Sequence, residues 1–173
     1  LTMCHAWTER RFELEVECPV ASLRFDARSF GAAGNGVTAD HKAIQAAIDH
    51  ASRAFNATSS QRACAVLSQG IFLTGGLVLR TNAVLFVDGT ASMRASTNGS
   101  DYLQQIALLQ QSGHTTSGVA LSLLAGVLAH NSRVAGRGIL DGQCPQYVTG
   151  VGHSNGLGEW FPDQFTFRSL VVP

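Results

Sequence analysis

The fold is decided by the stretch Ser29-Phe-Gly-Ala-Ala-Gly-Asn-Gly-Val-Thr-Ala-Asp-His-Lys-Ala-Ile-Gln-Ala-Ala-Ile-Asp49. Its glycines allow positive φ angles and therefore a tight turn. Thr38 or Asp40 is predicted to cap, through a side-chain oxygen, the helix that follows over residues 39–55. The apolar stripe of this helix consists of Ala43, Ile44, Ala47, Ile48 and Ala51. Such a short stripe of small residues predicts a helix that lies flat on the end of a β-structure and closes it as a lid.

Short β-rich segments follow the helix and form a weak internal repeat centred on glycines. The three segments are Ala65-Val-Leu-Ser-Gln-Gly70, Val84-Leu-Phe-Val-Asp-Gly89 and Arg133-Val-Ala-Gly-Arg-Gly138. Each has an apolar residue four positions before its glycine, and two of the segments follow an asparagine, Asn82 or Asn131. Repeats of this size are typical of a β-solenoid, in which each unit forms one rung. We expect the three apolar residues, Val66, Leu85 and Val134, to lie on one interior wall.

The spacing of these glycines predicts how many rungs there are. The first two glycines are 19 residues apart and the last two are 49 residues apart. The second interval therefore predicts two units of about 25 residues each. A middle rung is therefore expected within residues 101–129, interrupted by a polar loop over 110–118, with stacking resumed over 121–127. In front of the glycine turn, residues 1–22 are read as a separate segment containing a half-exposed strand over 12–16, and residues 23–27 as a second short strand.

Composition excludes several classes of function. The chain has 173 residues, a formal net charge of +0 and a single lysine, so nothing favours binding to nucleic acid or to an anionic membrane. Its longest apolar run, residues 119–129, is too short to span a membrane. No Cys or His spacing is typical of a zinc site, and we expect neither a metal nor a cofactor.

The cysteines and the glycosylation sequons indicate in which cellular compartment the protein works. Cys4, Cys18, Cys64 and Cys144 allow three disulfide pairings, and buried free thiols are an equal alternative. Asn56 and Asn98 begin Asn-x-Ser/Thr sequons in turn-like stretches, so both are glycosylation candidates. These sequons favour an extracellular, secreted protein, although no signal peptide is visible.

Other chemical motifs are better explained by structure than by catalysis. Residues 152–156 fit the Gly-x-Ser-x-Gly nucleophile elbow, but Gly158 and Pro162 disfavour the helix that this motif needs. The glycines of the turn do not have the order of a phosphate-binding loop. Trp160 with Phe161 is read as aromatic packing rather than a sugar platform. The histidines are interpreted as single residues without a metal role, with the two on the helix, at 41 and 50, at the surface.

The sequence resembles the polygalacturonases of glycoside hydrolase family 28, within the pectin-lyase-like superfamily. Four segments carry the resemblance in order: the glycine turn and helix over 25–48, then 69–80, 82–91 and 134–143. The resemblance implies an all-β, right-handed parallel β-helix with an N-terminal capping α-helix. It also implies inverting hydrolysis of α-1,4-linked galacturonan in pectin, in which a carboxylic acid protonates the leaving oxygen and other carboxylates activate water.

The catalytic motifs of that family are Asn-Thr-Asp, Asp-Asp, Gly-His-Gly and Arg-Ile-Lys, and none of them occurs in this sequence. We therefore expect residues 23–173 to be the N-terminal rungs of such an enzyme, truncated before its active-site turns. The resemblance also implies that Asp141 matches a structural turn residue of the family. No catalytic residue is therefore assigned, and the substrate-binding residues remain unassigned. The full-length enzyme is expected to be a monomer. Its expected partner is a pectic polysaccharide.

Two other functions fit the same fold, because fold does not fix function. One is a polysaccharide lyase or a rhamnogalacturonan hydrolase. The other is a non-catalytic β-helix that serves in adhesion or as a tailspike stem.

Overall fold

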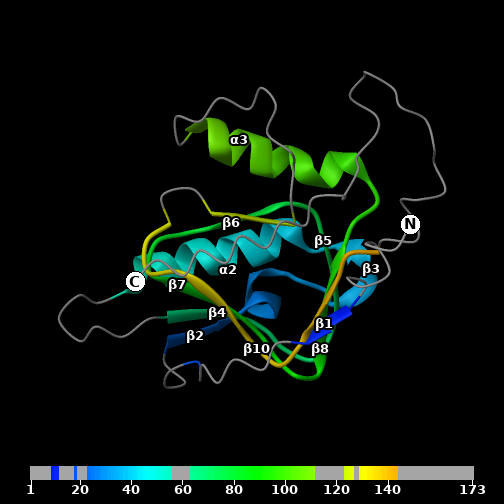
Figure 1. Ribbon diagram of the computed structural model, residues 1–173, viewed down its shortest axis with the longest axis horizontal. Helices are drawn as coiled ribbons and strands as arrows, with labels where there is room; N and C mark the ends of the chain where they lie inside the picture. The colour runs from blue at the N-terminus through cyan, green and yellow to red at the C-terminus, as the bar shows by residue number, and fades with distance from the viewer. Residues whose placement is uncertain are drawn as a thin grey trace.

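The computed structural model describes residues 9–11, 18, 23–55, 63–111, 123–126 and 129–143 (Figure 1). Within them the chain is mainly β-structure, coiled so that strands far apart in the sequence stack in parallel. Sheet A contains β3 (Asn35–Ala39), β5 (Gly70–Thr74), β8 (Ala91–Ala95), β11 (Ile139–Asp141) and β1 (Glu9–Arg11). Sheet B contains β2 (Arg24–Asp26), β4 (Ala63–Leu67), β7 (Ala83–Val87) and β10 (Arg133–Gly136). Sheet C contains β6 (Leu77–Leu79) and β9 (Leu124–Gly126).

This is a parallel β-helix, as the sequence predicted. One rung contributes β4, β5 and β6, and the next contributes β7, β8 and β9. The short strand expected over residues 23–27 is present as β2, and Ala27 begins the 3-10 helix η2 (Ala27–Phe30). The strands expected over 12–16 and after 169 lie outside the described residues.

Stacked side chains fill the interior in rows, one residue from each rung. Ala65 pairs with Leu85, and Leu85 pairs with Val134. On the second wall Phe72 pairs with Met93 and Met93 with Leu140, and these last three are at most 4% exposed. Apolar burial of this kind, worth about 25 cal/mol per Å², supplies most of the stability of a solenoid.

The predicted register of the first repeat is wrong by one residue. Val66 pairs with Phe86 and belongs to a second cluster, on the outer face of sheet B, so it does not share the interior wall of Leu85 and Val134. Its neighbour Ala65 occupies the interior row instead. The reason is turn length: two residues separate β4 from β5, whereas three separate β7 from β8.

The predicted middle rung is also wrong. β10 pairs directly with β7, so the 49 residues between the two repeat positions form one rung with an insertion. Part of the insertion is a helix, α3 (Leu103–Gln111), preceded by the 3-10 helix η3 (Gly99–Tyr102), and Figure 1 shows α3 outside the coil, above β6. The stacking expected over residues 121–127 does resume, as β9 against β6.

An asparagine pair confirms that these two rungs are neighbours. Asn82 and Asn131, which precede β7 and β10, both have positive φ angles, of 63° and 56°. The side-chain amide of Asn131 donates to Asn82 Oδ1 at 2.9 Å. Asparagine tolerates the left-handed conformation better than most residues, which explains its use at both turns.

The lid is α2 (His41–Arg53), close to the predicted bounds. It packs against β2, β4, β6 and β7, and four residues of the predicted stripe, Ile44, Ala47, Ile48 and Ala51, are 0% exposed. The predicted cap is wrong in detail. Asp40 holds the N-cap position, but its carboxylate accepts from the backbone N–H groups of Ala33 and Gly34, at 2.7 and 3.0 Å, and makes no hydrogen bond to the helix. It therefore fixes the glycine turn.

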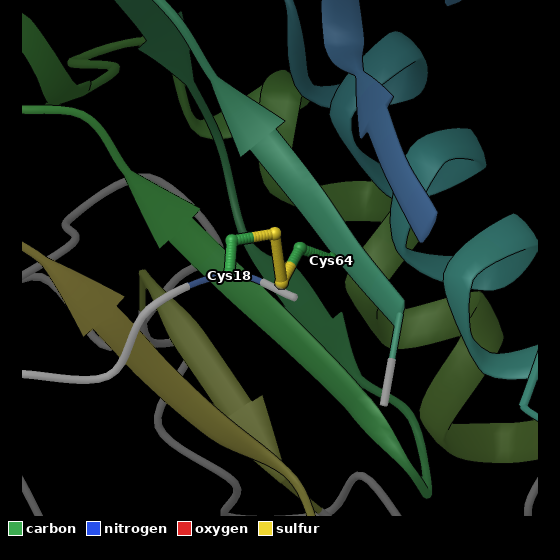
Figure 2. Close-up of a disulfide and its surroundings, with 2 residues drawn as sticks. All are labelled: Cys18 and Cys64. Atoms are coloured by element: carbon green, nitrogen blue, oxygen red, sulfur yellow. A yellow bond between two sulfur atoms is a disulfide. The ribbon is translucent and has the colours of Figure 1, made fainter. Parts of the chain in front are cut away.

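The two described parts of the N-terminal segment, β1 and Cys18, contact different rungs. β1 pairs antiparallel with β11, in the last described rung, while Cys18 forms a disulfide with Cys64 of β4 (Figure 2). The disulfide decides one of the pairings that the sequence left open. Cys64 is fully buried, so the half-buried Cys18 covers the outer face of sheet B at this point.

Candidate functional site

The three sheets differ in what covers their outer faces. On sheet B, the apolar residues Cys64, Val66, Val84 and Ala135 are buried beside Cys18. On sheet C, α3 packs against β6, and the buried Gln105 donates from Nε2 to the carbonyl of Leu77 at 2.9 Å. Sheet A has no such cover among the described residues. Its outward positions, which alternate with buried ones, are all partly exposed: Ile71, Leu73, Ser92, Arg94, Ile139 and Asp141.

We define the open face as these six outward residues of β5, β8 and β11. The parallel pairing places Ile71, Ser92 and Ile139 in one row across the three strands. Leu73, Arg94 and Asp141 form the next row. A mixture of apolar side chains with a few polar groups is typical of a ligand-binding surface. The open face is therefore the candidate binding site of the described part of the chain.

Arg94 and Asp141 form the polar centre of the open face. The guanidinium Nε of Arg94 donates to Asp141 Oδ2 at 2.9 Å, and the two side chains are 34% and 22% exposed. The other carboxylate oxygen of Asp141 accepts from the backbone N–H of Gln143 at 2.9 Å. The side-chain amide of Gln143 donates to the carbonyl of Ala95 and joins this turn to β8. Both oxygens of Asp141 are thus engaged, whereas Arg94 brings a positive charge to the surface.

The aspartates of the described residues all serve structural contacts. Their partners are Arg28 N–H for Asp26, the glycine turn for Asp40, Arg80 and Gln45 for Asp49, Thr90 for Asp88, Ser96 for Asp101, and Arg94 with Gln143 for Asp141. The hydroxyl and backbone N–H of Thr90 lower the pKa of Asp88. A general acid in a glycosidase needs a raised pKa instead. The described part of the chain therefore offers no uncommitted aspartate for this role.

His41 is buried, which corrects the prediction that it lies at the surface. It is 8% exposed at the start of α2, and its Nδ1 atom has no hydrogen-bond partner. Burial lowers its pKa from the ordinary 6.5, Lys42 adds to the effect, and Asp101 and Asp40 oppose it. Because the folded pKa lies below the unfolded one, protonation lowers the stability of the lid as the pH falls below about 6.5. His50 is exposed, as predicted, and packs edge-on against Phe25.

Of the two sequon asparagines, only Asn98 lies among the described residues. Asn98 is exposed at the start of η3, where its Oδ1 accepts from Ser100 N–H at 3.2 Å. Asn56, the 152–156 motif and the aromatic pair Trp160–Phe161 lie outside the described residues. No group of three or more His, Cys, Asp or Glu residues in the described ranges could hold a metal ion. No helix in those ranges is long and apolar enough to span a membrane.

Several solved structures resemble this chain. A protein from Parabacteroides merdae ATCC 43184, described as a candidate glycosyl hydrolase, aligns with a TM-score of 0.55 and 20% identity over 80% of this chain and 56% of its own. The hyperthermoactive exopolygalacturonase from Thermotoga maritima aligns with a TM-score of 0.53 and 21% identity over 75% of this chain and 26% of its own. This chain thus spans about half the length of the first and a quarter of the second.

Neither a known family profile nor a curated protein sequence matches the chain. At these identities the two likenesses concern the fold alone. They confirm the all-β, right-handed parallel β-helix that the sequence predicted. The chain is built on the β-helix fold that it shares with these two proteins.

Proposed function

We propose that this chain forms the N-terminal rungs of a polygalacturonase-like glycoside hydrolase, which acts on pectic polysaccharide by inverting hydrolysis. One observation carries the proposal: the four family-like segments fold in order around one coil. The glycine turn leads into the lid α2, residues 69–80 form β5 and β6, residues 82–91 form β7, and residues 134–143 form β10 and β11. The likeness to glycosyl hydrolases supports the same class of function.

These rungs contribute binding rather than bond cleavage. The sequence contains none of the four catalytic motifs, and each described aspartate is engaged in a structural contact. The open face offers a partly exposed guanidinium, Arg94, which lies between Leu73 and its ion-pair partner Asp141 and keeps N–H groups besides the Nε that Asp141 engages. Arginine binds carboxylates through charge-assisted hydrogen bonds, and galacturonan carries a carboxylate on each sugar. We therefore assign galacturonan binding to the open face.

Secretion belongs to the same proposal, because pectic polysaccharides are extracellular. The disulfide between Cys18 and Cys64 supports it, since structural disulfides persist in oxidising compartments. The exposed sequon at Asn98 is compatible with passage through a glycosylating pathway.

Two measurements test the proposal. The chain should release no reducing ends from polygalacturonate, and its migration in a native gel containing polygalacturonate should be retarded. We expect Arg94→Ala to raise the dissociation constant obtained from this retardation at least about tenfold, because a charge-assisted hydrogen bond contributes about 1.5–3 kcal/mol. Arg80→Ala is the matched control, because Arg80 also pairs with an aspartate, Asp49 at 2.7 Å, but lies at the lid.

Each part of the proposal would be contradicted by a different result. Release of reducing ends by this chain would contradict the assignment of these rungs to binding. Equal retardation of the Arg94→Ala and Arg80→Ala variants would contradict the role of the open face. Retardation by a neutral polysaccharide as strong as by polygalacturonate would contradict the choice of an acidic substrate.

A further inference from the structure

A bulge in β3 borders the open face. β3 pairs with β5 at two positions, Asn35 with Ile71 and Ala39 with Leu73. The three residues of β3 at 36–38 therefore lie opposite a single residue of β5. Bulges change the direction of a strand and are frequent beside functional sites. This bulge lies at the edge of the open face, because Ile71 and Leu73 are two of the six residues of that face.

The side chain of Asn35 holds the bulge in one conformation. Its Oδ1 atom accepts from the backbone N–H groups of Val37 and Thr38, at 2.9 and 2.8 Å. Its Nδ2 atom donates to Thr38 Oγ1 at 3.0 Å. Asparagine side chains that bond the backbone two and three residues on stabilise a turn in this way. The backbone of the bulge therefore has a defined position beside the open face.

Gly36 is the residue of the bulge that lies next to Arg94. A Cβ atom at Gly36 would lie 3.2 Å from Cγ2 of Ile71 and 3.8 Å from Nη1 of Arg94. Among the described residues, Asp141 alone accepts a hydrogen bond from Arg94, and it engages Nε. The guanidinium therefore reaches from Asp141 to the backbone of Gly36. Its N–H groups at Nη1 and Nη2 are left for a ligand.

Backbone conformation alone does not require glycine at position 36. Its φ is +74°, and the same chain has asparagine at φ angles of 63° and 56°, at Asn82 and Asn131. Asparagine tolerates this left-handed region better than most residues. Gly36 also has Ile71 and Arg94 as neighbours, so a side chain there would press against Ile71 and occupy the space beside the guanidinium.

We propose that Gly36 is a specificity-determining residue of the open face: without a side chain, it keeps the Arg94 guanidinium open to a carboxylate of galacturonan. The inference rests on the proposed function, because it concerns the same site. A carboxylate binds arginine most strongly through two parallel N–H···O bonds. Because Asp141 holds Nε, both bonds must come from the Nη atoms. The space at Gly36 therefore decides whether a ligand carboxylate can form both.

Gly36→Asn tests the proposal, and Gly31→Asn is the matched control. Gly31 also has a positive φ, +99°, but a Cβ atom there would have no other atom within 4 Å. Both variants place asparagine in a left-handed conformation, and only Gly36→Asn places it beside Arg94. Loss of one charge-assisted hydrogen bond should raise the dissociation constant for polygalacturonate at least about tenfold in Gly36→Asn. Gly31→Asn should bind as the wild type does.

A double-mutant cycle shows whether Gly36 acts through Arg94. In the Arg94→Ala background, Gly36→Asn should cause no further loss of affinity, because the group that it obstructs is already absent. A loss of affinity that persists in this background would overturn the proposal.

Chemical modification by phenylglyoxal, which reacts with guanidinium groups, measures access to Arg94 without any polysaccharide. Peptide mapping should show that Arg94 is modified more slowly in Gly36→Asn than in Gly31→Asn. Circular dichroism checks that both variants fold. Gly36→Ala, which adds only the Cβ atom 3.8 Å from Nη1, should slow the reaction less and serves in place of an unfolded Gly36→Asn.

The two measurements separate this inference from the proposed function. Equal modification of Arg94 in Gly36→Asn and Gly31→Asn would overturn the role of Gly36 and leave the proposed function standing. Slower modification in Gly36→Asn, with a wild-type chain that polygalacturonate does not retard, would contradict the proposed function and the inference with it.

Discussion

Gly136→Ala should unfold the chain at temperatures at which the wild type is folded. Gly136 ends β10 with a φ of +111°, and a Cβ atom there would lie 2.0 Å from the carbonyl oxygen of Val87 in the rung beneath. That oxygen belongs to the backbone of a core strand and cannot move aside. Positive φ costs about 1–2 kcal/mol and overpacking about 1–3 kcal/mol. We expect a loss of about 2–5 kcal/mol in urea unfolding, against a typical total stability of about 5–15 kcal/mol.

Gly89→Ala is the matched control. Gly89 is exposed in the turn between β7 and β8, and a Cβ atom there would meet only the Cβ of Arg137, at 3.6 Å, which is ordinary contact. Its variant should unfold within about 0.5 kcal/mol of the wild type. If both variants were equally stable, β10 would not lie against β7 as described.

Gln45→Leu should be the second most damaging substitution, because the side chain of Gln45 hydrogen-bonds the backbone edge of β6 as a neighbouring strand would. β6 pairs with β9 on one side, while α2 lies on the other. There the amide of Gln45 donates to the carbonyl of Val78 at 2.9 Å and accepts from its N–H at 2.8 Å. Leucine fills similar space but leaves both groups unpaired, at about 1–3 kcal/mol each. Thermal unfolding should show a loss of about 2–6 kcal/mol.

Gln45→Glu separates hydrogen bonding from packing, because it preserves the shape of the side chain. Ionised glutamate cannot donate to the Val78 carbonyl, and Asp49 Oδ1 lies within hydrogen-bond distance of the same position. Both effects raise the folded pKa above the ordinary value of about 4.3, so the variant should regain stability relative to Gln45→Leu as the pH falls. A Gln45→Leu variant as stable as the wild type would refute the edge role of Gln45.

Sequence alone could predict the parts of this fold that depend on local geometry. Positive-φ turns and a 3.6-residue stripe are local signals, so the glycine turn, the lid and the existence of rungs are found by reading along the chain. The register of the rungs cannot be found in this way, because strand pairing fixes it and the turn length varies by one residue between rungs. Val66 therefore lies outside, although it occupies the same position relative to its glycine as Leu85.

Features that depend on contacts between distant parts of the chain could not be predicted from local sequence signals. Insertions such as α3 are tolerated because loop closure costs grow slowly with length, so a 49-residue interval fits one rung as well as two. Nothing in Glu9–Arg11 predicts its antiparallel partner 130 positions away, at 139–141. The open face has no sequence signal either, because it is defined by what covers the outer faces of the other two sheets. The periodic signal that identified the α2 stripe could have placed His41 correctly, since His41 lies three residues before Ile44.

The most direct test is a disulfide between β7 and β10. Phe86 and Ala135 are paired neighbours on the outer face of sheet B, so cysteines at both positions should join, as strands about 4.8 Å apart allow. Val66 and Ala135 lie two rungs apart, about 9.6 Å, and the corresponding pair should not join. Peptide mapping of the oxidised Phe86→Cys/Ala135→Cys variant should recover an 86–135 cross-link. A folded variant without this cross-link would show that another rung separates the two strands and would contradict the account.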